Sequence, residues 1–135
     1  MLEKLCTTHI QIPRGSKVLV LEDDLARQCE FSRNLIGCQV TITHSAQCCI
    51  EHLELPGNYD LIFLDHDLGE RVFDDSRDVN TGCEVARYLE KHPTDAKIII
   101  HSLNPIGAAC MQAYLPKARR IPFAWNSIKV SNLEP

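Results

Sequence analysis

The chain has 135 residues, of which 44% are hydrophobic and 24% charged, and its formal net charge is −4. This length suits one domain with a single core, and the composition is that of a globular protein rather than a disordered one. The negative charge argues against sequence-independent binding of nucleic acid, and the short apolar runs exclude a membrane span. We therefore expect a cytoplasmic protein that binds neither nucleic acid nor membranes.

Short apolar runs alternate with amphipathic segments along most of the chain. Strands are predicted over residues 17–22, 39–43, 59–65, 97–102 and 119–123. Helices are predicted over residues 25–36, 45–54, 82–92 and 105–114. Strands that alternate with helices of about ten residues indicate right-handed crossovers and a parallel sheet. The predicted fold class is α/β, with a doubly wound, five-stranded parallel sheet.

The predicted domain spans residues 17–123. Residues 1–16 form an N-terminal extension with one candidate edge strand, and residues 124–135 form a C-terminal tail. Residues 66–80 form a long acidic loop. A lid over a site and a solvated insertion without a role are equally good interpretations of such a loop.

Two of the predicted helices begin with recognisable capping residues. Thr81 and Glu84 have the spacing of a capping box. Asn104 followed by Pro105 predicts an N-cap with proline at the first helical position. The seven cysteines are odd in number and include no Cys-x-x-Cys pair, so we interpret them as reduced thiols.

Acidic side chains follow two of the predicted strands. Asp23 and Asp24 come after the first strand, and Asp65 and Asp67 lie at the end of the third. Because the carboxyl ends of parallel strands meet at one edge of the sheet, these carboxylates are expected to lie close together. Carboxylates repel one another unless a cation lies between them. The sequence therefore predicts a Mg²⁺ (or Mn²⁺) site formed by these four residues.

Two histidines also lie at predicted strand ends. His66 follows Asp65, and His101 lies near the end of the fourth strand. With Asp65 as the chemical centre, each histidine is a candidate acid or base in a metal-dependent reaction. For His101, a core histidine bonded to a backbone carbonyl is an equally good interpretation.

Three further residues are candidates for binding phosphate. Ser102 and Asn104 precede a helix that starts with small residues, whose backbone N–H groups can hold an anion. Arg120 offers positive charge at the end of the fifth strand. A close-packed helix start and a solvated strand end explain these residues equally well.

These strand-end residues resemble the receiver domains of bacterial response regulators over residues 17 to about 123. The resemblance implies a flavodoxin-like sheet with strand order 2-1-3-4-5. It also implies that Asp23, Asp24 and Asp65 hold Mg²⁺, that Asp65 accepts a phosphoryl group from a partner kinase, and that Ser102 is the switch hydroxyl.

The sequence departs from that family at the fifth strand. Arg119-Arg120-Ile121-Pro122 stands where a receiver has a lysine followed by proline, so the phosphate-contacting lysine is missing. The motifs Leu-Asp-His-Asp-Leu-Gly at 64–69 and His-Ser-Leu-Asn-Pro-Ile-Gly at 101–107 resemble a divergent receiver-like family of bacteria and their phages. That family is associated with conflict or defence.

Three functions fit these residues. The one we favour is a stand-alone receiver-like regulatory domain that binds a divalent cation, accepts a phosphoryl group on Asp65 and acts on a protein partner, a kinase or an effector. The second is a metal-dependent phosphohydrolase that acts on a nucleotide or another phosphate-bearing small molecule; the extra histidines favour it. The third is a pseudo-receiver that acts only by protein contact. The missing lysine weakens the first of these.

Overall fold

The structure is a computed structural model that describes residues 9–68 and 80–131. Most of the predicted acidic loop, residues 69–79, and the start of the N-terminal extension lie outside the described residues. The lid interpretation of that loop therefore stays a prediction. The six cysteines in the described part form no disulfides with one another. No helix in the described ranges combines the length and apolar character that crossing a membrane requires.

The centre of the fold is a five-stranded parallel sheet with the order β3-β2-β4-β5-β6. Its strands are β2 (Lys17–Leu21), β3 (Gln39–Thr43), β4 (Leu61–Leu64), β5 (Lys97–Ile100) and β6 (Arg119–Arg120). Counted within this sheet, the order is 2-1-3-4-5, which confirms the predicted fold class. Strands β2 and β4 are buried along nearly their whole length, as is typical of parallel strands covered on both faces.

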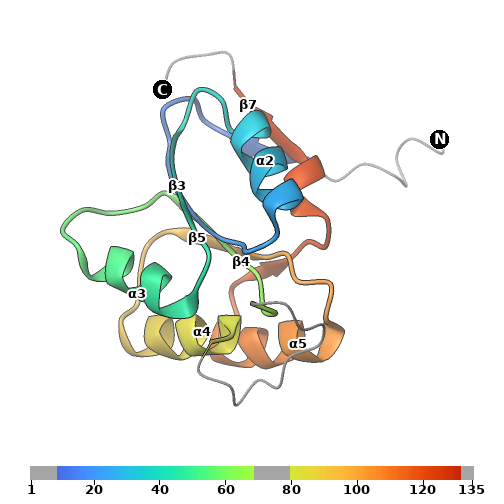
Figure 1. Cartoon of the computed structure of the whole chain (residues 1–135). Coiled ribbons are helices and arrows are strands. Elements are labelled where there is room, and N and C mark those ends of the chain that lie inside the picture. The colour runs from blue at the N-terminus through green and yellow to red at the C-terminus, as the bar shows by residue number, and fades with distance from the viewer. Residues whose placement is uncertain (1–8, 69–79, 132–135) are drawn as a thin grey trace.

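Helices cover both faces of this sheet (Figure 1). They are α2 (Leu25–Asn34), α3 (Ala46–Glu54), α4 (Gly82–Lys91) and α5 (Pro105–Tyr114). Side chains alternate along β2, so that Leu19 and Leu21 join the core beneath α3, α4 and α5. Val18 and Val20 join a second core on the opposite face, where α2 lies.

The two ends of the described chain form a separate pair of parallel strands. β1 (Ile10–Ile12) pairs with β7 (Ile128–Val130), and the short helix η1 (Ala124–Asn126) precedes β7. The strand expected in the N-terminal extension thus forms, but it pairs with the C-terminal tail and not with the five-stranded sheet. Buried side chains of both strands pack in the same core as Phe31 of α2.

The two predicted helix caps have different outcomes. Asn104 caps α5 as predicted, because its Oδ1 accepts the N–H groups of Ile106 and Gly107. The capping box at the start of α4 is wrong: the Thr81 side chain makes no capping hydrogen bond, and the Glu84 carboxylate pairs with Arg87. The start of α4 is fixed instead by its packing against the end of β4.

Candidate metal centre

Three strands end level with one another, and this register builds the site. Leu21 of β2 pairs with Leu64 of β4, which pairs with Ile100 of β5. The residues that follow these three in the chain are Glu22, Asp65 and His101. The N–H of Asp65 donates to the carbonyl of Leu21 at 3.1 Å, so the alignment continues past the strand ends.

These three residues form the Glu22–Asp65–His101 cluster, which is buried. Their exposed fractions are 0% for Glu22, 4% for Asp65 and 1% for His101. Nε2 of His101 lies 3.0 Å from Oε1 of Glu22. One candidate ligand atom from each residue lies within 4.8 Å of the other two. Two carboxylates and one imidazole at this spacing form a donor set that suits a divalent cation.

Arg27 of α2 reaches into the same pocket. Its Nε lies 3.1 Å from Oε1 of Glu22, and one of its terminal nitrogens lies 3.8 Å from Oδ2 of Asp65. The guanidinium also lies 5.3 Å from the centre of the Trp125 ring. Asp24 is the N-cap of α2, which makes Arg27 the third helical residue, and a side chain at that position turns back toward the cap.

Two polar atoms of the cluster are buried without a hydrogen-bond partner in the described part of the chain. They are Oδ2 of Asp65 and Nδ1 of His101; Nε of Arg27 is also buried, but it has its ion pair with Glu22. The other carboxylate oxygen of Asp65 accepts the N–H of His66 at 2.9 Å. Buried polar atoms without a hydrogen bond are rare because each retains the cost of its desolvation. Two together indicate a place where a ligand atom could complete the bonding.

The two carboxyl groups have opposite pKa shifts. Burial, reinforced by the charge of Glu22, raises the pKa of Asp65 to about 8. Burial also acts to raise the pKa of Glu22, but the hydrogen bonds from His101 and from the N–H of Asp24, together with the charge of Arg27, outweigh it and the pKa is lowered. Burial lowers the pKa of His101. Around neutral pH the pocket therefore holds an ionised Glu22, a protonated Asp65 and a neutral His101 beside the positive charge of Arg27.

A second group, the His66–Asp67–Asn104 cluster, lies at the same edge of the sheet. Nδ1 of His66 is 2.7 Å from Oδ1 of Asp67, and the same oxygen accepts Nδ2 of Asn104 at 3.1 Å. Gly107 covers the His66 ring so closely that a Cβ at this position would lie 2.4 Å from Cγ of His66. This cluster therefore joins the end of β4 to the start of α5.

Of the four predicted metal ligands, the structure places only Asp65 in the Glu22–Asp65–His101 cluster. The exposed Asp24 accepts the backbone N–H of Arg27 as a helix cap, and Asp67 belongs to the second cluster. Asp23 is partly exposed beyond the end of β2. Sequence reasoning assigned Glu22 to the strand and left it out of the site.

Of the three predicted phosphate-binding residues, Ser102 and Asn104 contact each other, whereas Arg120, in the described part of the chain, forms a hydrogen bond with neither. The hydroxyl of Ser102, which is buried, accepts the N–H of Asn104 at 3.0 Å. The exposed Arg120 has one terminal nitrogen 3.4 Å from the carbonyl of Pro105. Neither contact involves Asp65, so the phosphate-binding roles of these residues stay predictions.

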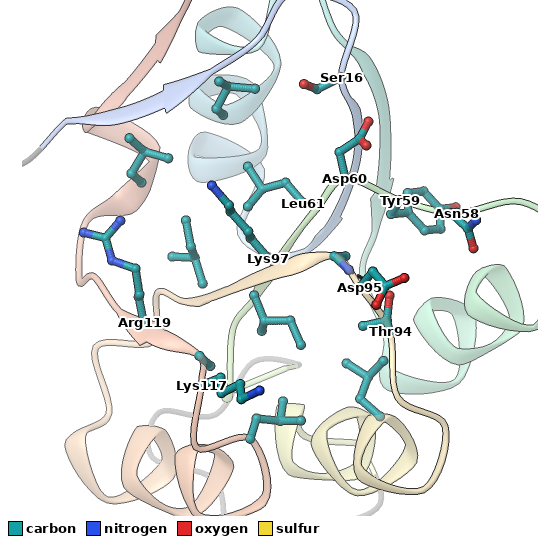
Figure 2. A pocket seen from close by; sticks show the side chains of 18 of the residues that line it. Ser16, Asn58, Tyr59, Asp60, Leu61, Thr94, Asp95, Lys97, Lys117 and Arg119 are labelled. Atoms are coloured by element: carbon teal, nitrogen blue, oxygen red, sulfur yellow. Dashed lines mark hydrogen bonds between the residues drawn. The ribbon is translucent and has the colours of Figure 1, made fainter.

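A wide groove lies at the opposite, amino ends of the strands (Figure 2). Its volume is about 1280 Å³, and its walls carry charges of both signs, including Asp60, Asp95, Lys97 and Arg119. Lys97 begins the strand that His101 follows, so the groove and the Glu22–Asp65–His101 cluster lie at opposite ends of β5. Among the described residues, the groove holds no grouping of metal-binding side chains.

A comparison with protein families matches residues 18–117 to the model of the cyclic-phosphate processing receiver domain. The match begins at the second residue of β2 and ends two residues before β6, and it includes all of the Glu22–Asp65–His101 cluster. No curated protein matches the chain.

Solved structures with a similar fold include response regulator receivers. A CheY-like receiver domain protein from Methanospirillum hungatei has a TM-score of 0.61 at 16% identity, over 90% of this chain and 85% of the other. The phosphorylated cyanobacterial phytochrome response regulator RcpA has a TM-score of 0.61 at 17% identity, over 80% of each chain. The Mn²⁺-bound form of response regulator Rcp1 has a TM-score of 0.56 at 16% identity, over 87% and 83%. At these identities the likeness shows the fold alone.

Proposed function

The chain belongs to the family of cyclic-phosphate processing receiver domains, and on that premise we propose that it binds a divalent cation at Glu22, Asp65 and His101 and opens a cyclic phosphate ester there. The family description supplies the substrate class. The proposal combines the receiver fold with the second function that the sequence predicted, that of a metal-dependent phosphohydrolase.

The observation that supports this proposal most is Oδ2 of Asp65, which is buried without a hydrogen-bond partner among the described residues, in a residue that lies beside two other candidate ligands. A carboxylate oxygen in this position needs either a proton or a cation. The imidazole of His101 makes the donor set less suited to Mg²⁺, which prefers oxygen ligands, than to Mn²⁺. We therefore propose Mn²⁺ as the preferred ion of the two that the sequence suggested.

The reaction is the addition of water to phosphorus. One ester P–O bond breaks, the ring opens, and the products are a phosphomonoester and a free hydroxyl, which takes the proton that the water loses. A bound divalent cation supplies charge stabilisation at the phosphoryl oxygens. Glu22, Asp65 and His101 would hold that cation. His66, which Gly107 covers, has no role in this step.

A ³¹P NMR assay tests the proposal. Nucleoside 2′,3′-cyclic and 3′,5′-cyclic monophosphates are incubated with the protein and Mn²⁺, and the appearance of phosphomonoester is followed. Glu22→Gln and His101→Gln should abolish turnover. Asp24→Asn is the matched control, because asparagine caps a helix as well as aspartate does and Asp24 lies outside the cluster. Turnover that is absent in the wild type, or equal in Glu22→Gln, contradicts the proposal.

Phosphoryl transfer to Asp65 is a second candidate function, favoured by the position of this residue at the end of the central strand β4. In that case the domain is regulatory, and its partner is a kinase or an effector protein. Incubation with Mg²⁺ and acetyl phosphate, followed by intact-mass measurement, should give an adduct in the wild type and none in Asp65→Asn. If neither turnover nor an adduct forms, the pseudo-receiver interpretation remains.

A further inference from the structure

Arg27 occupies the side of the proposed metal centre on which Oδ2 of Asp65 lies, the oxygen that has no hydrogen bond within the described residues. It forms an ion pair with Glu22 at 3.1 Å and one with Asp65 at 3.8 Å. In the described part of the chain, no other arginine or lysine forms an ion pair with the Glu22–Asp65–His101 cluster. The arginine side chain is 28% exposed, whereas those of Glu22 and Asp65 are 0% and 6% exposed. The guanidinium thus closes the pocket from its solvent side.

We infer that Arg27 is the resident counter-ion of this site, that it gives way to the divalent cation, and that it then binds the anionic group of the ligand. The inference rests on the proposed function, because it requires a cation to bind at Glu22, Asp65 and His101. It adds a residue that neither the sequence analysis nor the family match assigns to a role.

The charges in the pocket do not allow both cations to stay. Glu22 and Asp65 together offer at most two negative charges, whereas a divalent ion and Arg27 together carry three positive ones. An uncompensated charge in a buried pocket is costly, and two cations that share the same carboxylates also repel each other. Arg27, being the partly exposed member, is the one that can leave.

The surroundings of Arg27 allow its side chain to move while the helix stays in place. The backbone at this point is fixed by the Asp24 cap, to which the Arg27 N–H donates at 3.0 Å. The guanidinium already lies over Trp125, an aromatic face that can hold it once it leaves the carboxylates. The Trp125 backbone is itself held, because its carbonyl accepts Nδ2 of Asn34 at 2.6 Å.

A released guanidinium at the mouth of the pocket is well placed to bind phosphate. Arginine binds phosphate oxygens through two parallel N–H groups. The lysine that receivers use for this contact is missing here, and the guanidinium of Arg120 is directed to the carbonyl of Pro105. Arg27 would therefore provide the positive charge that the fifth strand lacks.

Two binding measurements on the full chain test the inference. Mn²⁺ affinity is measured by EPR, and binding of inorganic phosphate to the Mn²⁺-loaded protein by calorimetry. In Arg27→Ala, Mn²⁺ should bind about tenfold more tightly, because no ion pair has to break, and phosphate about tenfold more weakly. Arg27→Met, which keeps an unbranched apolar stem over Trp125, should behave alike. Arg33→Ala is the control, since Arg33 lies on the same helix and pairs with Glu30.

The opposite signs of the two effects distinguish this role from a structural one, which would weaken both affinities together. Equal Mn²⁺ affinity in wild type and both Arg27 variants overturns the counter-ion role and leaves the metal centre standing. Tighter Mn²⁺ binding with unchanged phosphate binding overturns the anion-binding role. If neither the wild type nor the variants bind Mn²⁺, the proposed function fails together with this inference.

Discussion

The two polar clusters at the carboxyl edge of the sheet differ in how their hydrogen-bonding groups are satisfied. In the Glu22–Asp65–His101 cluster, two residues carry a buried atom that has no hydrogen-bond partner in the described part of the chain. The His66–Asp67–Asn104 cluster contributes no such atom there. A fully bonded polar network stiffens a fold, whereas an incompletely bonded one is costly unless a ligand completes it. This difference favours our proposal that the first cluster is the binding site and that the second supports it.

The largest effect is expected from breaking the supporting cluster. In Gly107→Ala, the new Cβ would lie 2.4 Å from the His66 ring, which is buried and cannot withdraw. We expect a loss of about 3 kcal/mol in the free energy of unfolding, measured by urea denaturation. The exposed Ala109 on the same helix gives the control Ala109→Ser, with an expected loss of about 0.5 kcal/mol. Equal stability of the two variants would contradict the supporting role.

Neutralising the binding site should instead stabilise the metal-free protein. The pKa of Asp65 is raised to about 8 in the folded protein, far above its usual value. The buried carboxyl is therefore tolerated when protonated, at low pH, and the folded protein loses stability as pH rises through 8 because the carboxyl has to ionise. In chelator at pH 9, Asp65→Asn should therefore unfold with a free energy about 2 kcal/mol higher than the wild type, and the difference should shrink toward pH 5.

The control for this comparison is Asp24→Asn, which changes the same charge at an exposed helix cap. Its free energy of unfolding should stay near that of the wild type at both pH values, because both residue types cap well. A wild type that is more stable than Asp65→Asn in chelator at pH 9 would show that the Asp65 carboxylate is well paired without a cation.

The Asp67→Asn variant distinguishes the roles of the two clusters, and its expected effect on stability is smaller. The variant loses the negative charge that accepts from both His66 and Asn104, and we expect it to unfold about 1 kcal/mol more easily. Its Mn²⁺ affinity should stay within about twofold of the wild type, since Asp67 lies outside the metal centre. A large loss of Mn²⁺ affinity would restore Asp67 to the ligand set that the sequence predicted.

The sequence was sufficient for the sheet and for the edge at which the site lies. Apolar runs such as Leu61–Leu64 form strands that are buried on both faces, and their carboxyl ends meet because the strands are parallel. The pairing of β1 with β7 could not be predicted, because each strand has three residues and the partners lie at opposite ends of the chain. The last strand of the sheet is shorter than predicted and ends before Pro122, which cannot donate to a ladder.

The sequence was not sufficient to choose the ligands at that edge. Glu22, Asp23 and Asp24 follow one another, and which of them faces the pocket depends on the register of β2 with β4 and on the capping of α2. The sequence analysis chose the two residues after the strand. The structure instead turns Glu22 inward and uses Asp24 as a helix cap. Arg27 was missed because its role depends on that cap, which directs the third helical residue back over the strand end.

The most direct test of the account is a Mn²⁺ titration of the wild type and Glu22→Gln, followed by the EPR signal of free Mn²⁺, with Asp24→Asn as the matched control. We predict a single site in the wild type, an affinity lower by about tenfold or more in Glu22→Gln, and no change in Asp24→Asn. No binding to the wild type, or a loss in Asp24→Asn with none in Glu22→Gln, would contradict the claim that the buried cluster is the metal centre.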